Sequence, residues 1–536
     1  MVIGQPELNR NPVTDAPPSA AEPASAYDRM VYFGHPFEQT HPDRLATIAS
    51  LHGMEPAPVS CCRVLELGCA DGGNLIPMAY QWPRSEFIGI DLSEQAIAKA
   101  VASAASLELG NIRMIRGDIL DIGADLGQFD YIIAHGVYSW VPPPVRDKVM
   151  AIFRRNLSPA GVAYVSYNAY PGSHLRDIAR EMMLFHVRAI GDPQARVDQA
   201  RRLLEVLAEA SNEKELYGFL LHGQWERVRD MPDSRLYHDD LEESSRAFYL
   251  HQVVEEAAGH GLQYLSDAMH PLLSLDRLPA PVAAMISQIP ETDAVGREQY
   301  LDFIKGCSFR ATLLCHQEVS LRRQMEPASI ARYHLIANTV PAAAGFDLNA
   351  AEIARFKTAD GGTIATDHKL SKAALVHLGT VWPQAVAFRD LVERARSLIG
   401  AAAGATGDGQ ADVEALEKIL FSMACAGPVT LSLCPPRLTT VVSERPEASL
   451  LARRQGAEGP MLTNLRHIAV VMEDEQVRRF LALIDGTRTP GEIVRDLNAA
   501  TPPDPGGGGE SGRPEVTRED VAHNLTVMAR LGLLVA

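Results

Sequence analysis

The sequence predicts an α/β fold built on a doubly wound, mostly parallel sheet. Short apolar strands alternate with helices between residues 63 and 167, and a glycine-rich turn follows the first of these strands. Strands that are apolar along their whole length are typical of a sheet with both faces covered, and strand–helix alternation makes such a sheet parallel. We therefore expect a Rossmann-like sheet with further domains attached.

Six segments have the apolar composition of buried strands: Arg63–Leu67, Phe87–Ile90, Ile112–Ile115, Tyr131–His135, Val162–Tyr167 and, after an interruption, Leu262–Leu265. Helices are expected between them, over residues 73–81, 94–107 and 144–156. Ser93 is suited to cap the second helix, and Glu94 is favourable at the positive end of its dipole.

At roughly 100–200 residues per domain, a chain of 536 residues predicts about three domains. The expected divisions are a disordered tail at 1–25, an α/β domain at 26–170 and 246–284, a helical insertion at 171–245, a mainly helical middle domain at 285–455 and a small C-terminal domain at 460–536. The insertion is predicted to be helical because apolar residues recur at helical spacing, at Leu175, Ile178, Met182 and Phe185.

The C-terminal domain is expected to be winged-helix-like, with three short helices and a strand at Leu533–Val535. Thr489 and Thr517 each precede an acidic residue by three positions, which is the pattern of a capping box at a helix start. No basic recognition helix is present, so protein contact or plain packing is favoured over DNA binding.

Composition and charge narrow the classes of partner. The net charge is −17, and no basic run is present, which disfavours nucleic acid and anionic membranes as partners and favours a lysine-rich protein. The seven cysteines have no zinc spacing, no apolar leader is visible, and no apolar run reaches the ~18 residues that a membrane span needs. We therefore expect reduced thiols and a cytoplasmic protein.

The glycine-rich turn is the run Val64–Asn74, in which a buried strand leads through Gly68 and Gly72 into a helix. Glycines allow a tight turn and let a ligand lie against the backbone, while the helix start offers free N–H groups. Asp91 ends the second strand, 19 positions after Gly72, where a carboxylate can accept from both hydroxyls of a ribose. The pattern predicts a nucleoside-containing cofactor.

Three features distinguish S-adenosylmethionine from NAD at such a site. The turn lacks the Gly-x-Gly-x-x-Gly spacing, Glu66 stands two positions before Gly68, and Asp118-Ile119 follows the third strand. A carboxylate beside a free backbone N–H suits the 6-amino group and N1 of adenine. NAD binding, or a glycine turn without any cofactor, are the weaker alternatives.

In these residues the chain resembles class I S-adenosylmethionine-dependent methyltransferases. The resemblance implies that Glu66 orients the loop and helps to bind the ammonium group, that Asp91 holds the ribose, and that Leu92 packs on adenine. It implies a cofactor site composed of Tyr32, Glu66, Gly68, Cys69, Ala70, Gly72, Asn74, Asp91, Leu92, Asp118, Ile119 and His135.

A narrower resemblance lies outside the sheet. The segments 32–42, 135–142, 167–172, 298–303 and 309–314 are similar to methyltransferases with a methyltransferase regulatory domain, a family that includes bacterial lysine methyltransferases of outer-membrane proteins. This resemblance implies a protein-lysine N-methyltransferase whose regulatory domain is the middle domain at 285–455. A small-molecule N- or O-methyltransferase and a non-catalytic, cofactor-sensing protein are the alternatives.

The acceptor site is expected at the loops after the fourth and fifth strands. Tyr138, Trp140 and Asn168 are the predicted acceptor-site residues, since aromatic faces favour a neutral lysine and its methylated product. His135 is a candidate general base, although a buried strand end more often carries a packed residue. Packing is the alternative for every aromatic residue here, Tyr167 and Tyr170 included.

Two further histidine patterns carry less weight. His35 and His41 flank an aromatic N-terminal segment, containing Tyr32, that is expected to close over the cofactor. A metal site at Tyr237–Asp240 is not expected, because adjacent side chains rarely converge on one ion.

Overall fold

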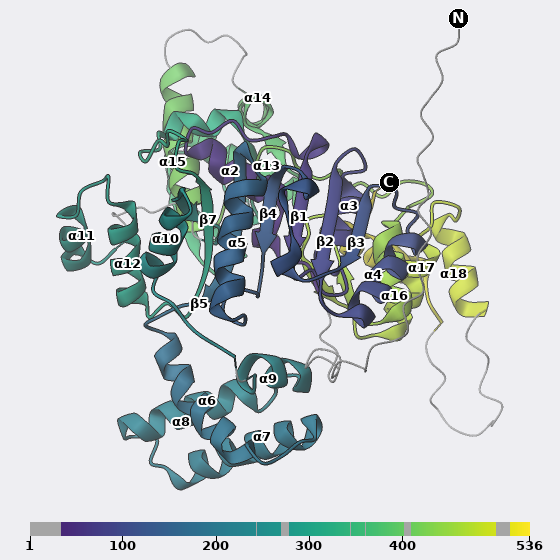
Figure 1. Ribbon diagram of the computed structural model, residues 1–536. Helices are drawn as coiled ribbons and strands as arrows, with labels where there is room; N and C mark the ends of the chain where they lie inside the picture. Colours follow the sequence, from purple (N-terminus) through teal and green to yellow (C-terminus); the bar gives the residue numbers. More distant parts are fainter. Residues whose placement is uncertain are drawn as a thin grey trace, which may run out of the picture.

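The α/β domain of the computed structural model contains one seven-stranded sheet (Figure 1). The structure describes residues 34–242, 244–269, 278–343, 345–359, 361–400, 409–499 and 515–535. In chain order the strands are β1 (Arg63–Leu67), β2 (Glu86–Asp91), β3 (Ile112–Arg116), β4 (Phe129–Ala134), β5 (Leu157–Asn168), β6 (Leu262–Asp267) and β7 (Phe309–His316).

The spatial order of the strands is β3-β2-β1-β4-β5-β7-β6. Strands β1 to β5 run parallel to one another, and β7 runs antiparallel between β5 and β6. The doubly wound sheet is therefore confirmed. The sequence prediction missed β7, which it placed in a separate, mainly helical domain.

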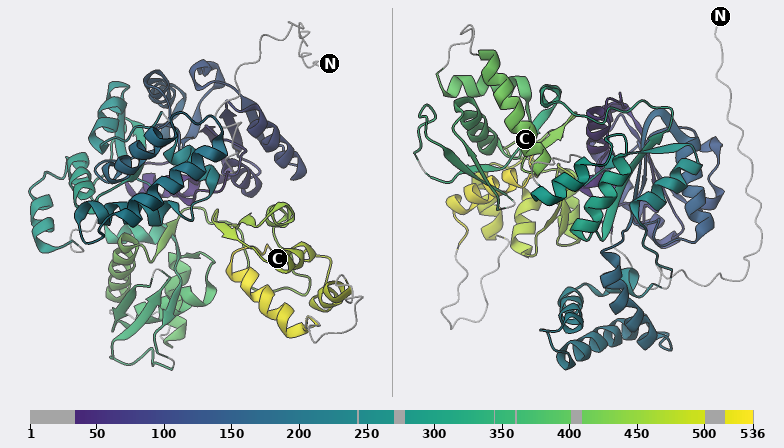
Figure 2. Two further views of the ribbon diagram at one scale, coloured as in Figure 1. Left: turned by 90° about the horizontal axis from the view of Figure 1, so that it is seen from below. Right: turned by 90° about the vertical axis from the view of Figure 1, so that its left-hand side faces the viewer.

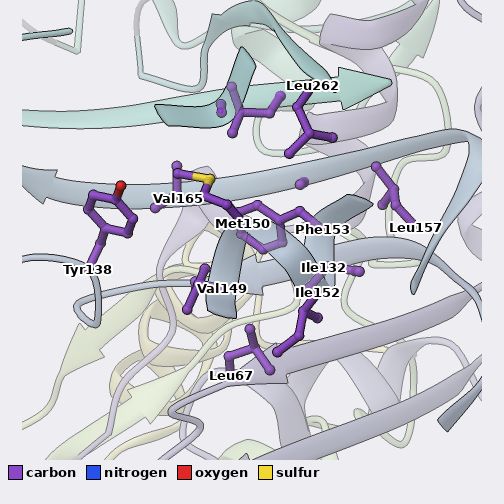
Figure 3. Packing of buried hydrophobic residues seen from close by; sticks show 14 of the residues in the cluster. Leu67, Ile132, Tyr138, Val149, Met150, Ile152, Phe153, Leu157, Val165 and Leu262 are labelled. Carbon is purple, nitrogen blue, oxygen red and sulfur yellow. The ribbon is translucent and has the colours of Figure 1, made fainter. Parts of the chain in front are cut away.

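Helices cover both faces of the sheet. They are α2 (Pro42–Leu51), α3 (Leu75–Gln81), α4 (Glu94–Ser106), α5 (Pro143–Asn156) and α10 (Leu250–Gly259). A further helix, α12 (Ala294–Lys305), packs against α10 and is preceded in the chain by α11 (Ala280–Ser287). Successive residues of β1 alternate between the faces: Val64 packs with α2 and α3, and Leu65 packs with α5 and α10. Figure 3 shows the second of these clusters from close by.

The predicted insertion is a helical lobe of α6 (Ser173–Val187), α7 (Pro193–Ala210), α8 (Leu216–Val228) and α9 (Asp233–Asp240). The lobe lies apart from the sheet, on the side where β5 ends (Figure 1). Its own core is small, and Asp240 is buried between the guanidinium groups of Arg176 and Arg227. Asp240 belongs to the run Tyr237–Asp240, which was considered above as a metal site, and its carboxylate is paired with these two arginines.

The middle part of the chain contains more strand than expected. Its elements are β8 (His334–Ile336), β9 (Thr339–Pro341), β10 (Ala354–Thr358), β11 (Thr363–Thr366), α13 (Lys369–Val381), β12 (Val386–Ala387), α14 (Phe388–Leu398), α15 (Gly409–Ala426) and β13 (Thr430–Ser432). Two three-stranded sheets, β11-β10-β9 and β12-β8-β13, pack with the three helices around one core. The strands are only two to five residues long, which is too short for a clear period-two signal in the sequence.

The last part, called here the C-terminal unit (residues 448–535), contains α16 (Leu450–Glu458), β14 (Met461–Thr463), β15 (Ala469–Val471), α17 (Glu475–Leu483), α18 (Pro490–Ala499) and α19 (Arg518–Arg530). It begins before the predicted boundary at 460, because Ala448 and Ala452 belong to its core. The capping contacts at Thr489 and Thr517 are both present. Figure 2 shows this unit and the middle part on the same side of the α/β domain.

Candidate active site

The site lies where the parallel strands end, at the junction of β1 and β4. Chain order reverses there, since β1 is followed in space by β2 on one side and by β4 on the other. Ligands of doubly wound sheets bind at such a switch point, outside the carboxyl ends of the strands. The predicted glycine-rich turn leaves β1 at this position.

The turn has a fixed shape. Gly68 has φ 72° and Ala70 has φ 46°, both in the left-handed region. The Asp91 carboxylate accepts hydrogen bonds from the backbone N–H of Ala70 and of Ser93, each at 2.9 Å. Asp91 therefore stands at the end of β2 as predicted, and it also braces the turn. The sequence did not indicate that second role.

Glu66 is buried beneath the turn. Its Oε1 accepts from the side-chain amide of Asn74 at 2.7 Å, and its Oε2 has no hydrogen-bond partner among the described residues. Burial raises the pKa of Glu66 to about 8. An acidic oxygen left unpaired below a glycine-rich turn is available to a cationic ligand group.

The predicted adenine end of the site lies beside β2 and β3. Leu92 follows Asp91 and is 63% exposed, which is unusual for a leucine next to a deep core. Asp118 caps a short turn by accepting from the N–H of Leu120 at 2.8 Å. Ile119, between them, is half-buried. These side chains leave a partly apolar rim next to the Asp91 carboxylate.

Residues 34–41, called here the N-terminal segment, cover the turn. The N–H of Gly34 donates to Asp71 at 3.0 Å, and the N–H of Phe37 donates to Asn74 at 3.0 Å. A Cβ at Gly73 would lie 2.3 Å from the backbone of Gly34, so the two glycines allow the chains to touch. Tyr32 lies outside the described residues.

His135 follows β4 and faces this segment. Its ring lies against that of Phe37 with centroids 3.8 Å apart and the planes tilted by 35°, and its Nδ1 lies 2.9 Å from the hydroxyl of Tyr164. Ser166 Oγ also lies 3.3 Å from Nδ1. Burial lowers the pKa of His135 to about 3, so the ring is neutral at physiological pH. The neutral ring is positioned by Tyr164 and Ser166, and its role as a general base stays a prediction.

The aromatic residues after strands β4 and β5 differ in how deeply they are buried. Tyr138 is fully buried in the core, where its hydroxyl donates to Glu256 (Figure 3). Tyr167 is also buried, with its hydroxyl 2.8 Å from that of Thr312. Both rings therefore have the packing role that was the alternative for them, and the structure gives Tyr138 no exposed face for an acceptor.

Trp140 and Asn168 remain at the strand ends. The backbone N–H of Asn168 donates to Ser139 at 2.8 Å, which ties the end of β5 to the loop after β4. Trp140 is half-buried, and the guanidinium of Arg176 lies 6.0 Å from its ring centroid. Tyr170 stacks on His174 with centroids 4.0 Å apart. These groups lie where the helical lobe leaves the sheet.

Sequence reasoning missed three groups at the site. Asp71 accepts from Lys99 at 2.7 Å as well as from Gly34, and Phe37 provides the ring that lies on His135. Both stand in segments quoted above, so their position was an available signal. His467, nearly 400 residues from the turn, donates from Nε2 to Asn74 at 2.9 Å, and no sequence pattern indicates it.

The strand order, the glycine-rich turn after β1 and the acidic residue at the end of β2 together define a class I, S-adenosylmethionine-dependent methyltransferase. A family model described as a methyltransferase domain matches residues 58–220, and one described as a predicted methyltransferase regulatory domain matches 232–316. The structure of PKMT2 from Rickettsia typhi in complex with AdoHcy is similar over 94% of this chain and all of that chain, with a TM-score of 0.84 and 28% identity.

Two proteins of Rickettsia prowazekii are also similar in sequence. RP028 is 34% identical over 233 residues, which is 93% of its length, and RP789 is 39% identical over 316 residues. The match spans 57% of the length of RP789 and 59% of this chain. The chain belongs to the methyltransferases that carry a methyltransferase regulatory domain, and S-adenosylmethionine is its cofactor.

The regulatory domain of the family model lies earlier in the chain than the predicted one. It runs from α9 through α10 and α12 to β7, so it includes the two strands that complete the sheet. The prediction that the regulatory domain spans residues 285–455 is therefore corrected, because the two ranges share only residues 285–316. Within the described ranges, no helix is both long and apolar enough to cross a membrane, and no cluster of three His, Cys, Asp or Glu side chains is arranged to hold a metal ion.

Proposed function

We propose that the chain transfers the methyl group of S-adenosylmethionine to lysine side chains of a protein. The observation that carries the proposal is the similarity to Rickettsia typhi PKMT2, a protein lysine methyltransferase, over 94% of the chain. That similarity includes the helical lobe, the middle part and the C-terminal unit, and so extends beyond the parts that bind the cofactor in any class I methyltransferase.

The cofactor is proposed to lie along the turn after β1. Gly68, Cys69, Ala70 and Gly72 would line its methionine portion, with the free Oε2 of Glu66 near the ammonium group. Such an oxygen is costly to bury unpaired, at about 1–3 kcal/mol, and a cationic ligand removes that cost. The residues present therefore fit the cofactor at this end.

At the other end, Asp91 would accept from the ribose hydroxyls and Leu92 would cover one face of adenine. Asp118 and Ile119 would contact the adenine edge, and His135 would border the methionine portion through its backbone. When bound, the cofactor supplies an already activated methyl group. The task left to the protein is to orient the acceptor and exclude water.

The acceptor nitrogen is proposed to enter between Trp140 and Asn168. A lysine must lose its proton before it attacks the methyl group, and an apolar surrounding lowers its pKa. The face of Trp140 also favours the methylated ammonium product by cation–π contact. His135, at the end of β4, is a neutral ring held by Tyr164.

An apolar stripe on α6 supports a polypeptide acceptor. Leu175, Ile178 and Phe185 lie on one face of the helix and are 56%, 40% and 67% exposed. The stripe starts seven residues after Asn168, on the helix that follows the end of β5. An exposed apolar patch of this kind marks an interaction surface, and its proposed occupant is the chain that carries the acceptor lysine.

The experiment uses the purified protein, isotopically labelled S-adenosylmethionine and a lysate of the source organism. Label on lysine in proteins, located by mass spectrometry, is the expected result, and the Asp91→Ala variant serves as the inactive control. Label confined to small molecules or nucleic acid would contradict the proposal.

The role of the apolar stripe on α6 can be tested separately, once a protein acceptor has been identified. Leu175→Ser and Phe185→Ser should each raise the KM for the acceptor roughly fivefold, the scale of a moderate interface contact. Val206→Ser on α7 changes an exposed apolar side chain elsewhere in the lobe, 42% exposed, and should leave the KM unchanged. Equal effects of all three substitutions would remove the stripe from the proposal.

A further inference from the structure

One buried amide links three distant segments of the chain. Asn74 stands just before α3 and is 4% exposed. Its Oδ1 accepts from the N–H of Phe37 at 3.0 Å and from Nε2 of His467 at 2.9 Å, while its Nδ2 donates to Glu66 at 2.7 Å. The N-terminal segment, the C-terminal unit and the acid beneath the turn therefore meet at a single side chain.

His467 is held in a specific orientation. It is 1% exposed and stands in the turn between β14 and β15, with φ 59°. The left-handed conformation costs about 1–2 kcal/mol for a residue with a side chain. The turn keeps it because Asn464 Oδ1 accepts from the N–H groups of Arg466 and Ile468. The position of the imidazole is thus determined by the fold of the C-terminal unit.

The hydrogen bond also determines which atom of each ring and amide faces the other. An amide oxygen only accepts, so Nε2 of His467 carries the proton and donates. The backbone N–H of Phe37 can only donate, so it fixes the amide of Asn74 with its oxygen toward Phe37 and His467 and its NH₂ group toward Glu66. If the amide were reversed, its NH₂ group would face the N–H of Phe37, and two donors would meet.

The C-terminal unit is seated firmly on this side of the sheet. Leu451 of α16 packs with Ile76 of α3 and Ala100 of α4, and the N–H of Leu450 donates to the hydroxyl of Tyr80 at 3.0 Å. The Arg466 guanidinium lies 3.8 Å from Glu38 of the N-terminal segment. His467 is therefore the polar centre of a larger contact that reaches the helix following the turn.

We propose that His467 is a positioning residue for the methyl-donor site: through Asn74 it aims Glu66 and holds the N-terminal segment over the glycine-rich turn. The C-terminal unit thereby sets the affinity for the cofactor. The inference rests on the placement of the cofactor's methionine end beside Glu66 and is independent of the lysine acceptor. Because linkage is reciprocal, a bound cofactor in turn stabilises the seat of the C-terminal unit.

The test measures the affinity for S-adenosylhomocysteine by calorimetry, which needs no acceptor. His467→Ala should weaken binding roughly fivefold to tenfold, the scale of one buried hydrogen bond. His467→Gln places an amide NH₂ where Nε2 stood and should recover most of the affinity. Met472→Ala removes a buried side chain of the same unit away from Asn74 and should have no effect on binding.

Two outcomes would overturn the inference. The first is unchanged affinity in a folded His467→Ala protein. The second is equal weakening in His467→Ala and Met472→Ala, which would indicate general loosening of the unit. Hydrogen exchange provides the reciprocal measurement: the cofactor product should slow exchange over residues 461–471 in the wild-type protein and not in Asn74→Ala. Equal slowing in both proteins would also overturn it.

Discussion

Two buried polar clusters of the α/β domain differ in whether their atoms are paired. Around Arg310 on β7, the guanidinium donates to Asp302, Glu298 and Asp267, so every charged nitrogen is used. Around Asn74, Glu66 Oε2 and His467 Nδ1 are buried and have no hydrogen-bond partner among the described residues. A cluster in which every polar atom is paired, called here closed, supports the fold. A cluster with unpaired buried atoms, called here open, carries a free-energy cost that a ligand can remove by pairing with them.

The largest expected effect concerns the closed cluster. Arg310→Met should lower the free energy of unfolding by about 3–5 kcal/mol, because it leaves carboxylates buried without their cation. Chemical denaturation measures this change. Arg154→Met, which breaks an exposed pair with Glu318, should have a much smaller effect. Similar losses in both variants would mean that the Arg310 cluster is not a structural element.

The next effect concerns the turn beside the open cluster. Asp91→Ala should weaken cofactor binding by about 1.5–3 kcal/mol, or roughly 10-fold to 150-fold in Kd, because it removes charge-assisted hydrogen bonds to the turn and the proposed contact with the ribose. Calorimetry gives the value. Glu86→Ala changes an exposed acid at the other end of β2 and should leave the Kd unchanged. Wild-type affinity in Asp91→Ala would exclude Asp91 from the site.

Trp140 tests the acceptor side separately from the donor side. Trp140→Ala should slow methyl transfer by up to roughly 100-fold, the scale of a misplaced acceptor, while cofactor affinity stays unchanged. Trp140→Phe retains an aromatic face and should keep most of the rate. A loss of cofactor affinity in Trp140→Ala would instead place this ring on the donor side.

The smallest effect is a pH dependence due to Glu66. Its pKa of about 8 in the free protein lies above the ordinary value of roughly 4.3, so folding takes up a proton between these values. The contribution of Glu66 to stability is therefore complete below pH ~4.3 and is lost as the pH rises through 8. Because the ammonium group of the cofactor favours the carboxylate, binding below pH 8 should release up to about one proton.

Calorimetry in buffers of different ionisation enthalpy measures that proton. Glu66→Gln should abolish the release and flatten the pH dependence of stability between pH 5 and 8. The same proton release in Glu66→Gln would assign the proton to another group.

The sequence predicted most of the sheet because its parallel strands are buried on both faces and read as apolar runs. The strand Arg63–Leu67 was predicted with the bounds that the structure has. β7 was missed because it lies about 140 residues beyond β5 in the sequence, and pairing at that distance leaves no local pattern. The short strands of the middle part were missed because two to five residues show no reliable period.

The site residues that are close in sequence could be predicted, and those that are distant in sequence could not. Glu66, Asp91 and the glycines belong to one strand–turn–helix pattern, so spacing alone brought them together. Tyr138 stood in the same loop as Trp140, yet its ring turned into the core, and alternation along a loop does not reveal such a choice. His467 comes from another part of the chain altogether and is visible only once the chain is folded.

Ala70 has a consequence for the thermodynamics of cofactor capture. Its backbone at φ 46° lies where side chains are disfavoured, and the Asp91 carboxylate holds its N–H there by a hydrogen bond within the protein. Because that hydrogen bond belongs to the fold itself, the conformational entropy of the turn is lost on folding. Preorganisation of this kind favours binding with a small entropic penalty. Ala70→Gly should relax the turn in the free protein and make the entropy of binding less favourable.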